Sequence, residues 1–349
     1  MLKRFVIMVV SLAMAWCAVS SEAADKDRSW TIAPRTLPPP AGASEQLEKI
    51  LANMGAPSLA PLPTTLDGWR KQIATGNSAQ VEIGDPIIKE FNLDVKEEKS
   101  AGVRVYRVTP PLIAPEHVNR LFVNLHGGAF IYGNGRASLP EAAQIAAFLK
   151  IPVLAIDYRT APDHPAPAAM DDIVAVWREV LKTHKTANIA LGGTSAGGTL
   201  TLVATLRMKD LGVPLPAALF VGSPVADFSN RGDTRFINDG IDYITISWKK
   251  LVDPLALYAG SKSYDDPYIS PIFGNFKGFP PTYLIAGTRD LLLSDTVRAH
   301  QKLRQAGVEA DLHVYEGIAH AAFRIYQDAP ECPQHYAELN AFVSRHLDE

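Results

Sequence analysis

Gly193-Thr194-Ser195-Ala196-Gly197 is the stretch of the sequence that decides the fold. It follows the apolar run 188–192 and leads into the amphipathic segment 197–211, so it predicts a tight turn from a buried strand into a helix. Small residues beside the serine allow neighbouring chain segments to approach the turn and leave the hydroxyl exposed. The start of the helix adds positive potential and the free N–H of Ala196. We therefore interpret Ser195 as a nucleophile, although this string taken alone also fits a plain glycine-rich turn.

Short apolar runs and amphipathic segments alternate along most of the chain. The runs predicted as strands are 103–108, 121–125, 152–157, 188–192, 217–221, 282–286 and 311–315. The segments predicted as helices are 141–150, 168–184, 197–211 and 294–306, and Ser138 with Glu141 predicts a capping box at the first of them. This alternation predicts an α/β fold with a mostly parallel sheet, helices on both of its faces and a ligand site at the carboxyl ends of the strands.

Two regions depart from this alternation. Residues 24–63 are rich in proline and alanine and predict an extended lead-in with one helical patch at 45–53. Residues 229–279 contain no clear strand but carry large apolar residues at helical spacing, so we interpret them as a lid excursion over the sheet. The predicted domains are an N-terminal extension that contributes to a cap, 24–115, and a main α/β domain, 116–349.

Residues 1–23 have the pattern of a cleavable secretory signal. A short basic start precedes an apolar run over 5–19, whereas a membrane span needs about 20 apolar residues. We therefore expect cleavage after Ala23, a periplasmic or secreted protein and no stable membrane span. Lipidation at Cys17 is the alternative, which the bulky Trp16 before it disfavours. The only other cysteine is Cys332, which cannot form an internal disulfide by itself and is expected to be an inert packed residue.

A second motif, His126-Gly127-Gly128-Ala129-Phe130, ends the predicted strand 121–125. Acyl transfer needs backbone N–H donors aimed at the negative oxygen that develops on the substrate, and consecutive glycines let the main chain come close to it. We therefore predict an oxyanion hole from the N–H groups of Gly127, Gly128 and Ala196. A hairpin or loop turn is the alternative for this pentapeptide alone.

A serine at its free pKa needs a base, and after a nucleophile turn of this kind an acid and then a histidine follow along the chain. His320 lies in a predicted loop just after the strand 311–315, and Asp290 follows the strand 282–286. Asp295 is the rival acid, but its place at the start of a helix suits a capping or dipole role. His335 and the other histidine of the C-terminal helix region are expected to be solvated, as is usual for histidines in such a position.

Four sequence blocks occur in one order along the chain: 126–130, 157–172, 193–198, and the pair 287–290 with 317–320. With these blocks the chain resembles the bacterial hormone-sensitive-lipase-like esterases of the α/β-hydrolase superfamily. The resemblance implies an α/β-hydrolase fold with a helical cap that is built largely from the N-terminal region. It also implies the same site residues, namely a triad of Ser195, Asp290 and His320 and an oxyanion hole from Gly127, Gly128 and Ala196.

The chain departs from this family at three places. The family usually carries Asp before its nucleophile, so Thr194 removes a charge near the turn. Ala129 stands where some members have a third glycine, which is harmless if two N–H groups suffice. The region up to about Ala101 matches no block of the family, and substrate choice depends on that region. Phe130 and Tyr132 are candidates for lining an acyl pocket, with aromatic packing as the alternative.

The predicted function is hydrolysis of a small-molecule ester, of short or medium acyl length by the resemblance, through the triad and an acyl-enzyme. A lactone hydrolase, an amidase and a non-catalytic ligand-binding relative are the alternatives, and the last of these would have lost triad members that this chain retains. No cofactor is required. A homodimer is left open.

Two other classes of site are disfavoured. A metal site at His164 with nearby carboxylates is conceivable, but the surrounding prolines indicate a rigid loop in which those carboxylates serve as caps or ion pairs, so no metal is expected. The net charge is −3, and Lys and Arg are scattered along the chain. This pattern does not predict the basic surface that a nucleic-acid-binding protein needs.

Overall fold

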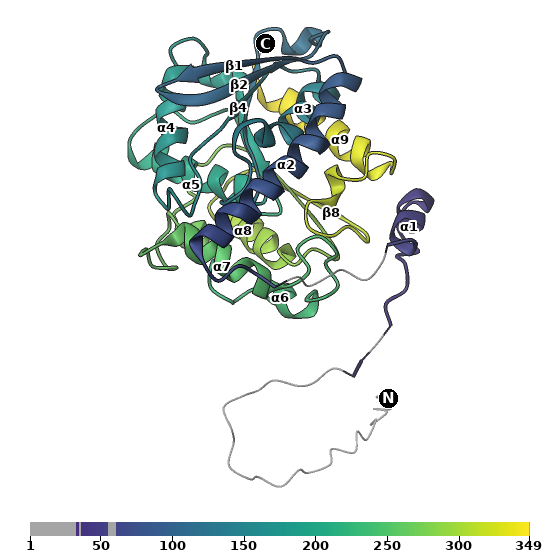
Figure 1. Cartoon of the computed structure of the whole chain (residues 1–349). Coiled ribbons are helices and arrows are strands. Elements are labelled where there is room, and N and C mark those ends of the chain that lie inside the picture. The colour runs from purple at the N-terminus through teal and green to yellow at the C-terminus, as the bar shows by residue number, and fades with distance from the viewer. Residues whose placement is uncertain (1–32, 35, 55–60, 349) are drawn as a thin grey trace, which may run out of the picture. The chain divides into compact units, whose positions relative to one another are not determined.

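An eight-stranded sheet forms the centre of the unit that runs from Pro39 to the C-terminus (Figure 1). The computed structural model describes residues 33–34, 36–54 and 61–348, so the predicted signal segment 1–23 lies outside the described residues. The strands are β1 (Asp94–Ser100), β2 (Val103–Thr109), β3 (Leu121–Leu125), β4 (Val153–Ile156), β5 (Ile189–Thr194), β6 (Ala218–Gly222), β7 (Thr282–Gly287) and β8 (Ala310–Tyr315). Their order is β1-β2-β4-β3-β5-β6-β7-β8.

The sheet is parallel from β4 to β8, and only β1 and β2 run antiparallel. Every residue of β3, β5, β6 and β7 is buried, as expected for parallel strands covered on both faces. β1 is a polar edge strand that the sequence analysis did not predict. It joins β2 through Ala101 and Gly102, whose φ angles of 50° and 82° fit the tight hairpin turn.

Helices cover both faces of the sheet. They are α1 (Glu45–Ala52), α2 (Leu66–Glu90), α3 (Leu139–Leu149), α4 (Ala168–Val180), α5 (Ala196–Asp210), α6 (Thr234–Ile237), α7 (Trp248–Ala259), α8 (Leu293–Gln305) and α9 (Glu331–His346). Alternate residues of β3 belong to two separate cores: Val123 packs with α4, α5 and α8, whereas Phe122 packs with α3 and α9. The predicted α/β fold, a mostly parallel sheet with helices on both faces, is therefore confirmed.

The 25-residue helix α2 is the largest element that the sequence analysis missed. It lies against α3, and glycines allow the close approach. A Cβ on Gly84 would come 3.2 Å from Pro140, and a Cβ on Gly76 would come 2.7 Å from the ring of Tyr132. The N-terminal region therefore contributes a long helix next to the loop that carries the predicted oxyanion donors.

The predicted capping box at the start of α3 does not form. The helix begins at Leu139, and Ser138 makes no side-chain cap but donates its hydroxyl hydrogen bond to the carbonyl of Gly135 at 2.8 Å. Glu141 does not reach back to the helix start; it is only 3% exposed and contacts Thr194. A carboxylate that the local pattern assigned to helix capping therefore faces the sheet.

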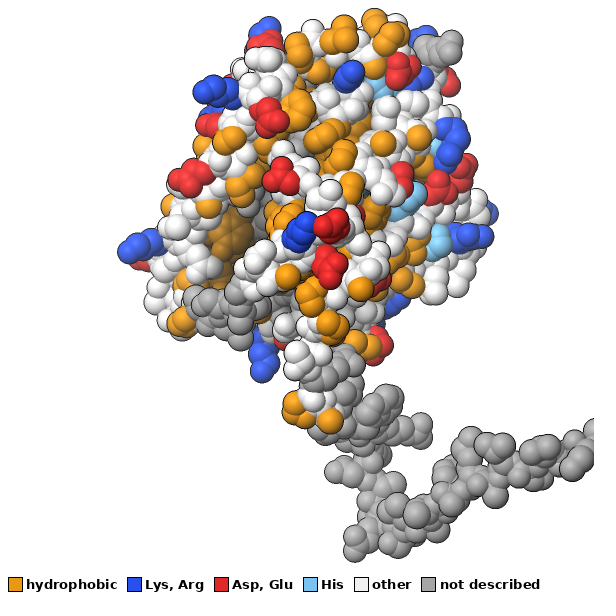
Figure 2. Space-filling model, turned by 90° about the vertical axis from the view of Figure 1, so that its right-hand side faces the viewer, with side chains coloured by type: hydrophobic (Ala, Val, Ile, Leu, Met, Phe, Trp, Pro, Cys, Tyr) orange, Lys and Arg blue, Asp and Glu red, His pale blue; other side chains and the backbone are white. Residues whose placement is uncertain are grey.

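Cationic and anionic side chains are interspersed on the face shown in Figure 2, and neither sign gathers into a patch there. Within the described part of the chain, no helix has both the length and the apolar character that a bilayer crossing requires.

Candidate active site

The turn between β5 and α5 holds Ser195 in a strained conformation, with φ 61° and ψ −121°. Its N–H donates to the carbonyl of Gly222 at 2.7 Å, which fixes the turn to β6. A Cβ on either Gly193 or Gly197 would come 1.9 Å from the carbonyl oxygen of Leu125. Only glycine fits at these two positions, so the sharp turn that the sequence predicted depends on both of them.

The structure brings Ser195, His320 and Asp290 into one hydrogen-bonded row. Ser195 Oγ lies 2.8 Å from His320 Nε2, and His320 Nδ1 lies 3.2 Å from Asp290 Oδ1. Because an ionised carboxylate can only accept, Nδ1 carries the proton and donates to Asp290, which leaves Nε2 to accept from the serine hydroxyl. The three residues come from the loops after β5, β7 and β8, at the carboxyl ends of the strands.

The electrostatic surroundings favour a protonated His320. Burial lowers the pKa of this imidazole, but Asp290 raises it by charge and by its hydrogen bond, and the charge of Asp242 raises it further. Arg324 opposes these two carboxylates, and the net pKa of His320 lies above the ordinary value of 6.5. The ring is therefore a stronger base than a free histidine and can hold the proton that it takes from Ser195.

Two partners that the sequence analysis missed hold the carboxylate of Asp290. The hydroxyl of Ser223 donates to Oδ2 at 2.5 Å, and the N–H of Leu292 donates to Oδ1 at 2.7 Å. Asp290 is completely buried, so these bonds compensate its lost hydration. Ser223 directly follows β6, and its place at the carboxyl end of a buried strand is the signal that could have indicated it.

Asp242 is a second buried carboxylate beside the triad and was also missed. Its Oδ2 accepts from the N–H of Leu291 at 2.9 Å and from the N–H of His320 at 3.3 Å, and its Oδ1 accepts from Ile244 and Thr245. Burial, followed by the negative charge of Asp290, raises the pKa of Asp242, and His320 opposes that rise. Asp242 thus ties residues of the 229–279 excursion to the loops that carry the acid and the base.

The predicted oxyanion loop lies against the serine turn. A Cβ on Gly127 would come 2.9 Å from the carbonyl of Thr194 and 3.4 Å from Ser195 Cβ, and Gly128 has a φ of 119°. Within the described part of the chain, the N–H groups of Gly127, Gly128 and Ala196 donate to no protein acceptor. Three donors are therefore left available near Ser195, as an oxyanion hole requires.

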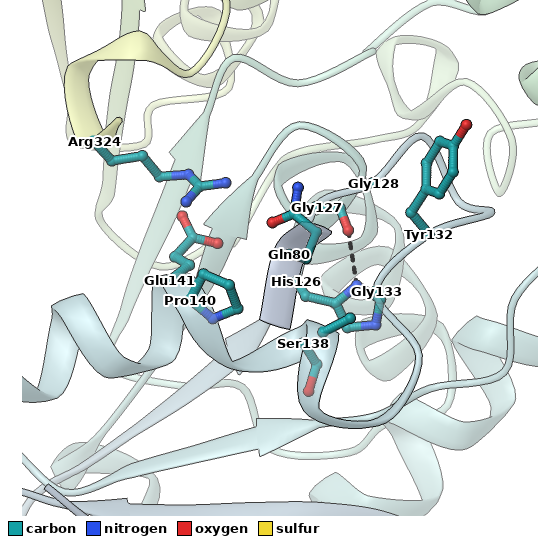
Figure 3. A pocket seen from close by; sticks show the side chains of 11 residues that line it. Gln80, His126, Gly127, Gly128, Tyr132, Gly133, Ser138, Pro140, Glu141 and Arg324 are labelled. Atoms are coloured by element: carbon teal, nitrogen blue, oxygen red, sulfur yellow. Dashed lines mark hydrogen bonds between the residues drawn. The ribbon is translucent and has the colours of Figure 1, made fainter. Parts of the chain in front are cut away.

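His126 fixes the conformation of this loop by a hydrogen bond and a stacking contact. Its Nδ1 lies 2.8 Å from the carbonyl of Gly127, an interaction drawn in Figure 3. Its ring stacks on Tyr158 with centroids 4.0 Å apart, and the Tyr158 hydroxyl donates to the carbonyl of His126 at 2.6 Å. Burial lowers the pKa of His126, so this imidazole is neutral and serves to fix the loop.

Glu141 lies next to Thr194, the residue before the nucleophile. The hydroxyl of Thr194 donates to Glu141 Oε1, and the N–H of Thr194 donates to Oε2 at 3.2 Å. Asn124 donates to the same Oε2 at 3.4 Å. The residue before the nucleophile is therefore uncharged itself, but α3 places a carboxylate next to it.

A cavity of about 540 Å³ opens beside Ser195 and His320. Both regions outside the regular alternation contribute apolar walls, namely Leu62 and Trp69 from the N-terminal part and Ile246 and Leu251 from the 229–279 excursion. The prediction that these segments act as a lid stays a prediction.

The two aromatic residues predicted to line the acyl pocket lie in different surroundings. Tyr132 lines the cavity, and its hydroxyl accepts from Gln72 at 2.8 Å. Phe130 is 1% exposed and stacks on Tyr258 with centroids 4.1 Å apart, so it is a core residue and not a wall of the cavity. Its alternative, aromatic packing, is what the structure shows.

The rival titratable residues have structural partners. Asp295 is no helix cap: it is completely buried and pairs with the equally buried Arg235 at 2.6 Å, while burial raises its pKa to about 6. His335 is not solvated, because it is fully buried and burial lowers its pKa to about 3. Burial raises the pKa of the Cys332 thiol to about 12, so it carries no nucleophilic thiolate at neutral pH.

The carboxylates near His164 bind arginines. Asp172 pairs with Arg159 at 2.7 Å, and Asp163 pairs with Arg70 at 2.8 Å. No group of three or more His, Cys, Asp or Glu side chains within the described ranges is arranged to hold a metal ion.

Known proteins share this fold. A family model described as alpha/beta hydrolase fold matches residues 122–324. An esterase of Acinetobacter venetianus is 29% identical over 260 residues, which cover 72% of this chain and 82% of that relative. The crystal structure of esterase E25 is 46% identical with a TM-score of 0.90, and the match covers 92% of this chain and 100% of that one. An esterase from the bacterial hormone-sensitive lipase family is 26% identical with a TM-score of 0.70, over 80% of this chain and 99% of that one.

These relatives and structural neighbours are esterases, and the activity that they support for this chain is that of a serine carboxylesterase. The matched region contains the serine turn, the oxyanion loop and the loops of the acid and the base. The chain therefore belongs to the α/β-hydrolase fold family, among the esterases of the bacterial hormone-sensitive lipase family.

Proposed function

We propose that the chain hydrolyses carboxylic esters of short to medium acyl length by two-step acyl transfer, with Ser195 as nucleophile, His320 as base and Asp290 as the acid that orients the base. The observation that carries this proposal is the row of hydrogen bonds from Ser195 Oγ through both nitrogens of His320 to Asp290. A serine alone is a weak nucleophile, and this arrangement is what activates it.

In the first step, His320 Nε2 takes the proton of the Ser195 hydroxyl while Oγ bonds to the carbonyl carbon of the ester. The carbonyl oxygen becomes an oxyanion that accepts hydrogen bonds from the N–H groups of Gly127, Gly128 and Ala196. When the tetrahedral intermediate collapses, the bond to the alcohol oxygen breaks, and the alcohol leaves with the proton held by His320. The product of this step is an acyl ester of Ser195.

In the second step, a water molecule gives a proton to His320 Nε2 and attacks the acyl carbon. The same N–H groups stabilise the second oxyanion, and its collapse breaks the bond to Ser195 Oγ, which takes the proton back from His320. The carboxylic acid leaves and the enzyme is regenerated. Asp290 keeps its charge throughout, since it stabilises the imidazolium and does not take its proton.

The cavity supports the choice of substrate. A volume of about 540 Å³ with apolar walls from Leu62, Trp69 and Leu251 accommodates an ester of modest size. A lactone would use the same machinery because it is a cyclic ester, and an amide would require the same residues to expel an amine. A ligand-binding protein without activity is disfavoured because the three triad side chains are within hydrogen-bonding distance of one another.

A chain-length series tests this proposal. Wild type is assayed with p-nitrophenyl esters of increasing acyl length, with a lactone and with an anilide, next to Ser195→Ala. We expect the esters to be the best substrates and Ser195→Ala to lose activity by about 10⁶-fold. Ser78→Ala is the matched control, because Ser78 is exposed on α2 and its hydroxyl donates, among the described residues, only to the carbonyl of Ala74. Wild-type ester hydrolysis by Ser195→Ala would refute the triad, and activity on the anilide alone would refute the ester proposal.

We further propose that the protein is exported, on the pattern of residues 1–23. Expression of the full chain in a bacterial host, fractionation and N-terminal sequencing test this point. A mature protein in the periplasm or medium that begins at Ala24 supports it, and an intact cytoplasmic chain overturns it.

A further inference from the structure

The cavity beside Ser195 carries positive but no negative side chains. Among the described residues, Lys250 and Arg324 line it and no Asp or Glu does, although the chain as a whole has a net charge of −3. Most of the other walls are apolar or glycine. A cationic wall in an otherwise apolar cavity selects for ligands that carry a negative charge.

Arg324 is held at this wall by its backbone. It ends the short 3₁₀ helix Ala322–Arg324, four residues after His320, and its carbonyl accepts from Gln144 Nε2 at 2.7 Å. The side chain borders both the large cavity and a neighbouring one of about 80 Å³. Its position relative to His320 is therefore fixed by the same loop that positions the base.

Among the described residues, the guanidinium of Arg324 has no hydrogen-bond or ion-pair partner within the chain. Its Nε is buried, and no described residue accepts a hydrogen bond from it. The carboxylate of Glu141 faces it in Figure 3, but no carboxylate of the described residues lies within 4.0 Å of the Arg324 nitrogens. Both oxygens of Glu141 already accept from Thr194 and one also from Asn124. A half-buried guanidinium without an ion-pair partner is stabilised when an anion from outside the protein binds to it.

Gln80 adds an amide beside this cation. It reaches from α2 toward Gly127 in Figure 3, and it lines the same two cavities as Arg324. A planar guanidinium next to an amide N–H₂ presents several donors in one region, which is the arrangement that recognises a carboxylate. A neutral alkyl chain would use none of these donors.

We infer that Arg324, with Gln80 beside it and the charge of Lys250 on the same cavity wall, binds a carboxylate that the substrate carries in addition to its ester, so that half-esters of dicarboxylic acids are the preferred substrate class. This inference rests on the proposed function, because it places the reacting ester at Ser195. Arg324 touches the substrate but takes no part in the bond changes, so it determines specificity and not the chemistry.

The test compares charged and neutral esters of equal length. Methyl hydrogen succinate, glutarate and adipate are paired with methyl butyrate, pentanoate and hexanoate, and methanol release gives kcat/KM for each. Loss of Arg324 would raise the pKa of His320, so each half-ester is compared with its neutral partner in the same variant and at the same pH, about 8.5. The variants are Arg324→Gln, Arg324→Lys, and Lys249→Gln as the matched control, since Lys249 neighbours Lys250 in sequence but is exposed and lines neither cavity.

Wild type is expected to prefer at least one half-ester over its neutral partner. Arg324→Gln should lower that preference by about 10- to 100-fold, as expected for the loss of a charged hydrogen bond, while neutral esters are still hydrolysed. Arg324→Lys should retain part of the preference because it keeps the charge but not the planar fork, and Lys249→Gln should retain all of it. If Arg324→Gln does not fold, high ionic strength applied to wild type must lower the preference by itself.

An unchanged preference in folded Arg324→Gln, or neutral esters favoured at every length by wild type, overturns the inference and leaves the proposed function standing. Loss of the proposed function would look different, because Ser195→Ala would then still hydrolyse the neutral esters.

Discussion

The backbone N–H of His320 donates to the buried carboxylate of Asp242 at 3.3 Å. The same carboxylate oxygen accepts from Leu291, the residue after Asp290, at 2.9 Å. One side chain from the 229–279 excursion therefore spans the loop of the acid and the loop of the base. The relative position of the two loops depends on this contact as well as on the direct bond between His320 and Asp290.

Replacing Asp242 by Asn should move the pH dependence of the reaction. The variant keeps one oxygen, which can accept from the N–H groups of Leu291 and His320, while its amide nitrogen replaces the oxygen that accepts from Ile244 and Thr245. It also loses the negative charge, which is one of the causes that raise the pKa of His320. Ester hydrolysis needs neutral His320, so the acidic limb of kcat/KM follows that pKa. With less negative charge the pKa of His320 falls, and the acidic limb should shift to lower pH while the plateau changes by less than about tenfold.

The remaining charged groups near His320 are Asp290, which keeps raising the pKa, and Arg324, which lowers it. Asp239→Asn is the matched control, because Asp239 lies on the same segment and, within the part of the chain that the structure describes, accepts only from the Ser247 hydroxyl, at 3.1 Å. The measurement is kcat/KM for a neutral short ester as a function of pH. An acidic limb that stays in place or moves to higher pH in Asp242→Asn would contradict an electrostatic role for this carboxylate.

Asp290→Asn and Asp295→Asn should separate catalysis from stability. Asp290 accepts from His320 Nδ1, and an amide there permits the wrong tautomer, so kcat should fall by about 10⁴-fold with little change in fold. Asp295 pairs with buried Arg235, so its loss leaves an uncompensated cation and should cost about 3–5 kcal/mol of the free energy of unfolding. Urea unfolding and active-site titration give the two quantities. Equal losses of kcat per folded site in both variants would show that Asp295 and not only Asp290 acts on the base.

The buried parallel strands could be predicted because each is a short, mostly apolar run, as in Leu121–Leu125 and Ala218–Gly222. β1 could not, because it is an edge strand with charged residues at most positions and little burial. The helix α2 contains several glycines and Pro86, which lower its local propensity. It is stabilised instead by its contacts with α3 and Tyr132, which no local pattern contains.

The candidate site divides in the same way. Ser195, Asp290 and His320 follow from the order of short motifs along the chain. The contact of Asp242 with His320 joins positions 78 residues apart, and that of Glu141 with Thr194 joins positions 53 residues apart. Neither carboxylate stands in a motif, and for Glu141 the local pattern indicated a helix cap. Such partners become visible only when the sheet brings distant segments together.

Gly197→Ala should prevent the serine turn from forming. The added Cβ would lie 1.9 Å from the carbonyl oxygen of Leu125, and a backbone atom cannot move away as a side chain can. We expect a loss of about 3 kcal/mol or more in the free energy of unfolding, with activity lost in whatever remains folded. Gly212→Ala is the matched control, because its positive φ of 63° costs about 1–2 kcal/mol but no atom lies within 4 Å of the new Cβ. Activity in Gly197→Ala close to that of the control would contradict the steric argument.

Thr194→Asp should be tolerated only when Glu141 is neutralised. The family usually carries an aspartate before its nucleophile, but in this chain Glu141 already accepts the hydroxyl and the N–H of Thr194. An added aspartate would meet that buried carboxylate, and two charges without a cation between them cannot both stay ionised there.

We expect Thr194→Asp to lose about 3–5 kcal/mol of the free energy of unfolding, and the double variant Thr194→Asp with Glu141→Gln to recover most of it. Glu141→Gln alone keeps one oxygen acceptor and should lose about 1–3 kcal/mol. Urea unfolding of the four proteins closes the cycle, and kcat/KM on a short ester should follow the same order. If the loss of unfolding free energy in the double variant equals the sum of the two single losses, the carboxylates at positions 194 and 141 do not repel each other. The carboxylate of Glu141 would then not replace the family's aspartate.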